Sequence, residues 1–215
     1  MPYNNYCSKK NQQSVVFKAN WNEKNTIKHS MNSQIKWFVP ILFSVSVVAT
    51  STLASEWELL NDSSSVRFIG VQEGSAFRGR FEDFSATISF DADNPSHGKI
   101  IGVVRVESVN SGDQERDSTL LDAEWFYPEK YPESRFESER IEELSDGTFQ
   151  AHGQLTLRGE TGPVTMDFSF ETSDLEAHLS GSFEIKRLDF GVGWPATNWV
   201  GDEVFVQIEL DLEGQ

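Results

Sequence analysis

Apolar and polar side chains alternate along most of the chain after residue 57. The alternation is clearest over 164–171, 179–186 and 204–211, where Val, Ile, Leu, Met and Phe recur at nearly every second position. A period of two places successive side chains on opposite faces of an extended backbone, so each segment is predicted to be a strand with one apolar face and one wet face. Weaker runs of the same kind cover 65–71, 77–81, 84–91, 99–109, 134–143 and 148–157.

Pairs of turn-forming residues separate these segments and limit the fold class. Each pair contains Gly or Pro, and they stand at 73–74, 94–95, 146–147, 162–163 and 201–202. About eight strands at this spacing, with no long helical pattern between them, indicate an all-β antiparallel sandwich or barrel. The segments 99–109 and 203–212 are about ten residues long, or roughly 33 Å. Strands of this length favour a closed, lipocalin-like barrel around a lumen, although alternation alone leaves a packed sandwich open.

One segment departs from the period of two. Residues 117–126 place Leu120, Leu121 and Trp125 at helical spacing, and Asp117 or Ser118 is suited to cap the first turn. We therefore predict one short helix that packs its apolar side on the barrel.

The distribution of charge divides the chain near residue 54. Residues 1–54 hold six of the 18 Lys and Arg and one acid, whereas 55–215 carry 12 bases and 33 acids, a formal net charge of −21. This second part has 161 residues, which suits one domain with one core. Its acidity excludes nucleic acid as a partner, because binding phosphates needs clustered Lys and Arg. It also disfavours adsorption to anionic membranes.

Residues 31–54 have the pattern of a secretory signal peptide. Lys36 precedes the apolar run 37–50, and small residues lead to Ala54, near which we expect cleavage. The run is shorter than the about 20 residues that span a bilayer, so no stable membrane anchor is expected. Residues 1–30 are then either an extension upstream of a misplaced start codon or a disordered leader. These features predict a periplasmic protein whose folded domain is 55–215.

The expected mature domain offers little catalytic chemistry. Cys7 is the one cysteine of the chain and precedes the signal, so 55–215 has neither a disulfide nor a thiol. His97, His152 and His178 lack the spacing of metal ligands, and no motif of a nucleophile elbow or zinc protease occurs. We expect no catalytic residue, metal or cofactor. A hydrolase that uses a carboxylate pair remains an alternative, because carboxylates are abundant.

Phenylalanine is frequent, with 16 in 215 residues, most of them after Ala54. Phe is large and has no polar group, so it can line a dry cavity without leaving a hydrogen bond unmade. We predict that inward-facing apolar residues line such a cavity, with ordinary core packing as the alternative. The candidates are Phe68, Phe81, Phe84, Ile88, Phe90, Val104, Val106, Trp125, Phe126, Phe136, Leu155, Phe168, Phe170, Phe183, Ile185, Phe190, Trp194, Val206 and Ile208.

Three arginines are candidates for contact with a ligand head group at the barrel mouth: Arg116, Arg158 and Arg187. A structural role is the other interpretation, in which Asp117 and Asp189 pair with the neighbouring arginines. The glycine-punctuated loop 190–194 lacks the third glycine and the following helix of a nucleotide site. It is predicted to be a tight turn that lets Trp194 and Trp199 cover one barrel end, either as a hydrophobic lip for the ligand or as a plug.

The domain resembles the YceI-like family of bacterial periplasmic proteins. The resemblance rests on an ordered series that covers nearly all of 55–215: GRFEDF at 79–84, SG at 111–112, RD at 116–117, LLDAEWF at 120–126, YPESRFES at 131–138, GQLTLRG at 153–159, PV at 163–164, RLDFGVG at 187–193 and VGDEV at 200–204. The resemblance implies a lipocalin-like barrel with an apolar tunnel that binds isoprenoid chains, such as those of quinones or prenyl diphosphates.

The residues and the resemblance together predict a binding protein for an isoprenoid or another amphiphilic lipid. Such a chain has no hydrogen-bonding groups, so its affinity would come from apolar area removed from water, at about 25 cal/mol per Å². A stress-related or protein-interaction barrel without lipid cargo is the alternative. The sequence leaves the head group and the formation of a homodimer open.

Overall fold

The computed structural model describes residues 55–194 and 199–215, which form one antiparallel sheet of 11 strands. The signal peptide and the extension predicted before residue 55 lie outside the described residues. The strands are β1 (Glu56–Leu59), β2 (Ser65–Gln72), β3 (Ser75–Phe81), β4 (Phe84–Ser89), β5 (Lys99–Arg105), β6 (Val109–Asn110), β7 (Glu133–Glu143), β8 (Phe149–Leu157), β9 (Glu160–Ser173), β10 (Glu176–Lys186) and β11 (Glu203–Gly214).

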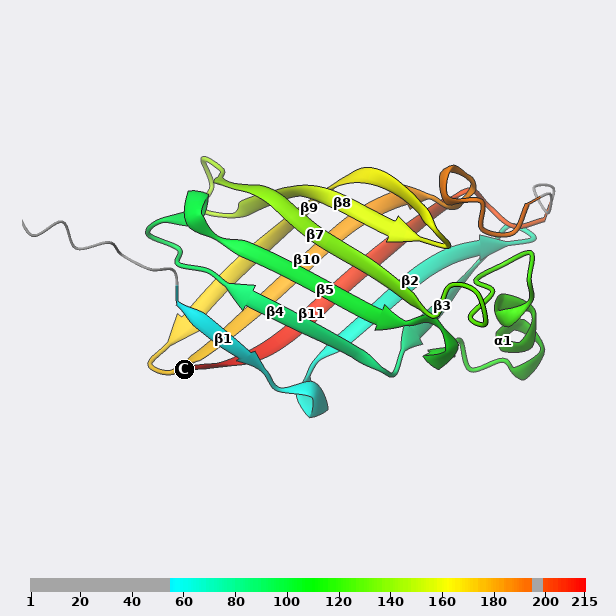
Figure 1. The fold of residues 1–215 in the computed structure, drawn as a ribbon, viewed down its shortest axis with the longest axis horizontal. Coiled ribbons are helices and arrows are strands. Elements are labelled where there is room, and N and C mark those ends of the chain that lie inside the picture. Colours follow the sequence, from blue (N-terminus) through cyan, green and yellow to red (C-terminus); the bar gives the residue numbers. More distant parts are fainter. Residues whose placement is uncertain (1–54, 195–198) are drawn as a thin grey trace, which may run out of the picture. The chain divides into compact units, whose positions relative to one another are not determined.

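The sheet closes into the predicted barrel. Neighbouring strands follow the order β1-β4-β5-β7-β8-β9-β10-β11, and β1 pairs with β11 to complete a ring of eight (Figure 1). The other three strands continue the sheet at one end of the barrel. β2 pairs with the N-terminal half of β11, and β3 pairs with both β2 and β6. A closed barrel leaves no long sheet edge, as the lengths of the strands suggested.

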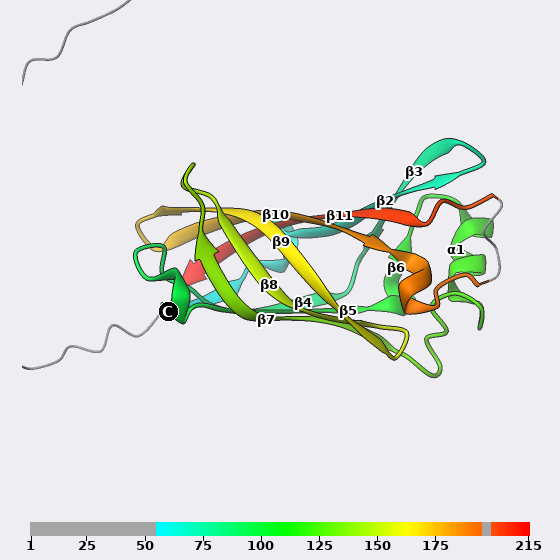
Figure 2. The same cartoon turned by 90° about the horizontal axis from the view of Figure 1, so that it is seen from above.

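Ser108 links two interruptions of the sheet, one between β3 and β4 at 82–83 and the other between β5 and β6 at 106–108. Its hydroxyl accepts hydrogen bonds from the backbone N–H groups of Glu82 and Asp83, at 3.1 and 3.0 Å, and donates to the carbonyl of Arg105 at 2.7 Å. The predicted strand 99–109 is therefore wrong beyond Arg105, where the 3₁₀ turn Val106–Ser108 intervenes. Past the breaks, the β2–β3 hairpin turns away from the barrel wall (Figure 2).

The predicted helix exists, but it begins and ends earlier. α1 covers Gln114–Leu121, and its N-cap is Asp113, whose carboxylate accepts from the N–H groups of Glu115 and Arg116 at 3.1 Å. Asp117 instead accepts a hydrogen bond from the N–H of Ser111 at 2.8 Å. Trp125 lies in the turn after the helix. Within the described residues, no helix has the length and apolar character needed to cross a membrane.

One predicted turn is also misplaced. Gly162 and Pro163 are not a turn, because both are paired with β8 inside β9. The chain reverses instead at Arg158 and Gly159, whose φ angles of 51° and 80° suit a tight hairpin turn. Gly at the second position adopts this left-handed conformation without a steric penalty.

Aromatic rings fill the end of the barrel away from α1. Phe90 has its ring centroid 5.1 Å from that of Phe149, 5.4 Å from Phe168 and 4.9 Å from Phe170, each in an edge-to-face arrangement. Trp57 donates its indole N–H to the carbonyl of Phe90 at 2.9 Å and packs on Phe170. We call these five residues the closed-end core.

Candidate functional site

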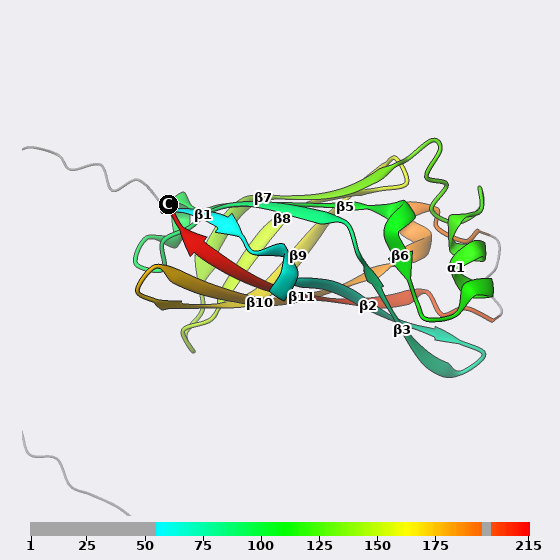
Figure 3. The ribbon, with the colours of Figure 1, turned by 90° about the horizontal axis from the view of Figure 1, so that it is seen from below.

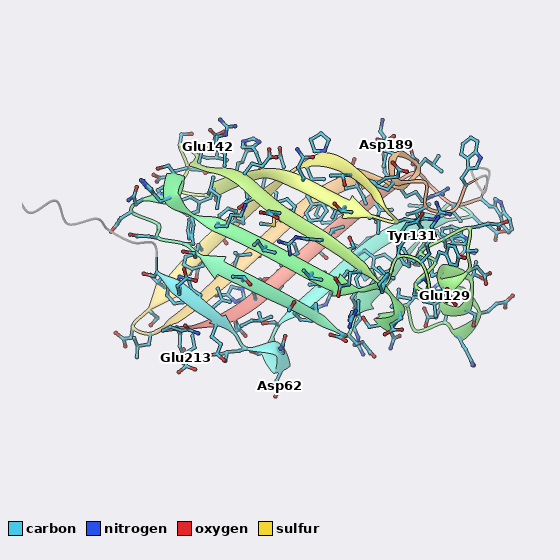
Figure 4. The ribbon with its side chains drawn as sticks, viewed as in Figure 1. Asp62, Glu129, Tyr131, Glu142, Asp189 and Glu213 are labelled. Atoms are coloured by element: carbon cyan, nitrogen blue, oxygen red, sulfur yellow. The ribbon has the colours of Figure 1, made fainter. Side chains whose placement is uncertain are left out.

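The other half of the barrel contains a cavity of about 160 Å³, beside α1. Its walls are the inward faces of β2–β5 and β7–β11, together with residues of α1 and the loops around it. Apart from Ser85, Ser134 and Arg187, every lining residue is apolar or glycine. The outside of the barrel is polar by contrast, and labelled acids such as Asp62 and Glu213 project away from the strands (Figure 4).

Most of the predicted lining residues reach this cavity. They come from eight strands and from the turn after α1, and those in strands lie on the inward face expected from the period of two. The predicted residues that line it are Phe68, Phe81, Phe84, Val104, Trp125, Phe126, Phe136, Leu155, Phe183, Ile185, Val206 and Ile208. Their contact with a ligand stays a prediction.

Seven predicted lining residues lie elsewhere. Ile88, Phe90, Phe168 and Phe170 are packed at the other end of the barrel, in or beside the closed-end core. The reason is that a period of two fixes the face of a strand that a side chain occupies, but not its depth along the barrel.

The other three are displaced by irregular backbone. Val106 is buried in the 3₁₀ turn between β5 and β6, outside the cavity wall. Phe190 packs near Gly162 of β9, where an added Cβ would lie 3.3 Å from its ring. Trp194 is 65% exposed and is not among the residues that line the cavity. Trp125 lines the cavity, and its ring lies against Gly193, where an added Cβ would be 2.7 Å from it.

Glycines that sequence reasoning missed shape the wall. Gly79 stands opposite Phe68 and Gly70 opposite Phe77, and an added Cβ would lie 2.3 and 2.9 Å from those rings. Each ring therefore lies across the neighbouring strand over a glycine. Gly102 differs, because nothing lies within 4 Å of the position that its Cβ would occupy. A Phe–Gly pair across a hairpin is the signal that could have revealed the first two.

Arg187 is the one predicted head-group arginine that lines the cavity. It is 3% exposed, and its guanidinium donates to the carbonyls of Gly201 (2.8 Å), Val192 (2.7 Å), Gly193 (3.1 Å) and Val200 (2.8 Å). It also stacks over Trp125, with 5.4 Å from Cζ to the ring centroid. Burial lowers the pKa of Arg187, while the charge of Asp202 opposes that shift. These contacts tie two loops together at the cavity mouth.

Arg116 and Arg158 do not line the cavity. Arg116 bonds to Gln72 at 3.1 Å, lies over the ring of Phe77 at 4.5 Å and is 3.7 Å from Asp113, so the acid beside it is Asp113 rather than the predicted Asp117. It joins α1 to the β2–β3 hairpin. Arg158 donates to the carbonyl of Ala123 at 2.8 Å. Among the described residues, no three His, Cys, Asp or Glu side chains form a group that could hold a metal ion.

Comparison with known proteins assigns the chain that forms this cavity to a family. The profile of the YceI-like domain matches residues 57–212. The chain belongs to the YceI-like family. A UPF0312 protein of Vibrio parahaemolyticus is 30% identical over 158 residues, which is 70% of this chain and 81% of the relative. A UPF0312 protein of Photorhabdus laumondii is 34% identical over 118 residues, 52% of this chain and 61% of that protein.

Solved structures show the same barrel. BcnA of Burkholderia cenocepacia superposes with a TM-score of 0.69 at 27% identity, over 72% of this chain and 99% of BcnA. A polyisoprenoid-binding domain from Saccharophagus degradans, implicated in plant cell wall breakdown, has a TM-score of 0.59 over 76% of this chain and 99% of the domain. At 16% identity this second likeness bears on the fold alone.

The stretches that resemble the YceI-like family gather around the cavity. Those at 79–84, 120–126 and 187–193 supply lining residues such as Phe81, Trp125 and Val192. None of the stretches contains a residue of the closed-end core. Several of the stretches that carry the resemblance therefore contribute to the cavity wall, while the family match itself extends over the whole barrel.

Proposed function

We propose that this YceI-like barrel binds the apolar chain of an isoprenoid or a related amphiphilic lipid in the cavity beside α1, and acts as a carrier rather than as an enzyme. The observation that carries the proposal is the chemistry of the lining, in which three residues are polar and the others apolar or glycine. Burial of a hydrocarbon chain there gains about 25 cal/mol per Å² and leaves no polar group of the chain unsatisfied. The polyisoprenoid-binding domain that shares this fold supports the choice of ligand class.

The arginines around the mouth favour a cargo with a neutral head group. Arg187 is engaged by four backbone carbonyls, Arg116 already bonds to Gln72 of β2, and Arg158 bonds to the carbonyl of Ala123 after α1. A diphosphate would have to displace such bonds and would meet a domain with a net charge of −21. A quinone or an alcohol meets neither cost. No covalent chemistry is needed for this role.

Gly102 provides the sharpest test. Its missing side chain would point into open space within the cavity, so Gly102→Leu should fill the site without displacing its neighbours. Natively purified protein should release lipid into an organic extract, detected by mass spectrometry, and the variant should release less than about a tenth as much. Thr87→Leu, on the exposed face of the adjacent strand β4, is the control and should keep the wild-type amount. Repeated recovery of empty wild-type protein would contradict the proposal.

We also propose that the carrier works in the periplasm. The proposal is supported by the signal-like segment at 31–54, with its basic start, apolar run and small residues before Ala54. Expression of the full chain in a Gram-negative host, followed by fractionation and mass spectrometry, should find a periplasmic species that begins near Ser55. A cytoplasmic product that retains residues 31–54 would count against export.

A further inference from the structure

The outer surface of the β2–β3 hairpin differs from the rest of the barrel exterior. Arg67, Arg78 and Arg80 are exposed there, and they are three of the 12 basic residues in the acidic part of the chain, 55–215. Arg67 stands directly opposite Arg80, and Arg78 opposite Ile69. Like charges directly opposite each other on two strands are unfavourable, and an anion in contact with them relieves the repulsion.

Two of these arginines have no acidic partner in the part of the chain that the structure describes. The exposed arginines of β5 and β7 each pair with a glutamate, and Arg80 pairs with Glu82 at 2.7 Å. Arg67 and Arg78 form no such pair among the described residues. Acids border this surface on β10 and β11, where Glu184 stands opposite Phe205, and Glu203 and Glu209 lie on the same face of β11 as Phe205. The guanidinium groups of Arg67 and Arg78 can therefore reach a second molecule.

Apolar side chains continue the same surface. Phe205 of β11 stands opposite Ile69 and is 37% exposed, although the alternation of its strand calls for a polar residue there. Val71, two residues further along β2, is 40% exposed. Trp199 is 58% exposed and accepts a hydrogen bond from Glu73 N–H through its carbonyl. We call Arg67, Ile69, Val71, Arg78, Arg80 and Phe205 the hairpin face.

The hairpin face is the reverse side of the cavity wall. Inward-facing neighbours on the same strands, including Phe68, Gly70 and Val206, line the cavity. The hairpin itself projects from the side of the barrel (Figures 2 and 3). A surface that presents arginines and apolar groups together, at the open end of the cavity, fits the phosphates and the acyl boundary of a membrane.

We propose that the hairpin face docks the barrel on an anionic bilayer and brings the cavity mouth to the lipid surface. This inference rests on the proposed lipid-binding function, because cargo of that kind must pass between the cavity and a membrane. The acidic remainder of the barrel does not prevent docking. Beyond about 8 Å its charges are screened at physiological ionic strength, so the arginines in contact dominate. The acidic body instead disfavours every orientation except the one led by the hairpin.

Vesicle flotation tests the docking surface. Wild-type protein should float with vesicles of phosphatidylglycerol and phosphatidylcholine, bind vesicles of phosphatidylcholine alone far less, and detach as salt is raised. Arg67→Gln combined with Arg78→Gln should weaken partitioning roughly 30-fold, the value expected for two arginines lost from an anionic surface. The matched control is Arg135→Gln with Arg140→Gln on β7, which changes the net charge equally and should keep wild-type partitioning.

Lipid extraction from the same preparations separates this inference from the proposed function. Variants that retain cargo and a wild-type unfolding transition, yet lose vesicle binding, support the docking surface. Cargo in the wild type without binding to anionic vesicles would overturn it, as would equal binding by the two double variants. Crosslinking that captures a protein through the hairpin face, with no vesicle binding, would assign the surface to a protein partner and overturn membrane docking. Vesicle binding by protein that never carries lipid would leave the docking surface standing and reject the cargo.

Discussion

The two ends of the barrel use the same kinds of apolar residues in different ways. In the closed-end core, Phe90 is surrounded by three other aromatic rings with centroids within 5.4 Å, and it is fully buried. At the α1 end, Phe136 and Phe183 stack at 6.3 Å on the wall of an open cavity. The closed end is packed like an ordinary protein interior, and the open end keeps space that its side chains do not fill.

This difference separates folding from binding within one sheet. A ligand that enters from the α1 end meets walls held by the closed-end core and by the hydrogen-bonded strands, so the site is formed before binding. The stretches that resemble the YceI-like family belong to the open end and its mouth, while the closed end carries none of them in its aromatic cluster. The closed end supplies stability, and the open end carries the proposed function.

The largest effect should come from truncating one ring at each end. Phe90→Ala removes a fully buried side chain that packs against three aromatic rings, and should lower the free energy of unfolding by about 3–5 kcal/mol. Phe183→Ala borders existing space and should cost less, about 2 kcal/mol, while changing the amount of lipid recovered. Chemical denaturation and lipid extraction on both variants measure the contrast. Equal stability losses would remove the distinction between the two ends.

The sequence predicted the strands well because side-chain direction follows from the period of two. The segments around β9, β10 and β11 have the expected inward faces, and nearly two-thirds of the candidate lining residues, Phe68 among them, reach the cavity wall. Depth along the barrel is set by the register between strands. No local pattern encodes that register, and the candidates that belong to the closed-end core were therefore misplaced.

Other errors came from hydrogen bonds between distant segments. Ser108 interrupts a strand by bonding to residues 25 and 26 positions away, which the alternation over 99–109 cannot show. The apolar spacing of the helix begins only at Leu120 and therefore predicts a cap at Asp117 or Ser118, whereas the N-cap is Asp113, also a favoured cap residue. The role of Arg187 depends on four carbonyls from two loops, and the nearby Asp189 suggested a different partner.

A stability loss of intermediate size should follow from removing the charge of Arg187, which holds together the loops at the cavity mouth. Arg187→Met keeps much of the apolar stem but leaves the carbonyls of Val192 and Val200 without their donor. Hydrogen bonds from a charged donor contribute about 1.5–3 kcal/mol each, and water can replace part of this at the mouth. We expect a loss of about 2 kcal/mol in unfolding free energy and faster hydrogen exchange at 191–194. Arg135→Met on β7, whose guanidinium pairs with Glu137, is the control and should change exchange at 191–194 little. Unchanged exchange at 191–194 in the Arg187 variant would contradict this role.

The smallest effect is expected on the outer surface of the closed end, where the stability of the fold should depend on pH while lipid binding in the cavity should not. His178 bonds to Asp211 at 2.7 Å and to Glu209 at 3.1 Å, and the bond to Asp211 raises the pKa of His178 most. A raised histidine pKa stabilises the fold below the unfolded value of about 6.5 and loses this contribution as pH rises through the folded value. The pKa of Asp211 is lowered by His178, so its contribution is present above the unfolded value and disappears in acid.

Because the side chains are partly exposed, the stability of the wild type relative to His178→Gln should fall by less than about 1 kcal/mol between pH 6 and 8.5. Denaturation curves across that range measure it, and the lipid content should stay constant. A parallel pH dependence in the two proteins would show that the contact of His178 with Asp211 does not contribute to stability.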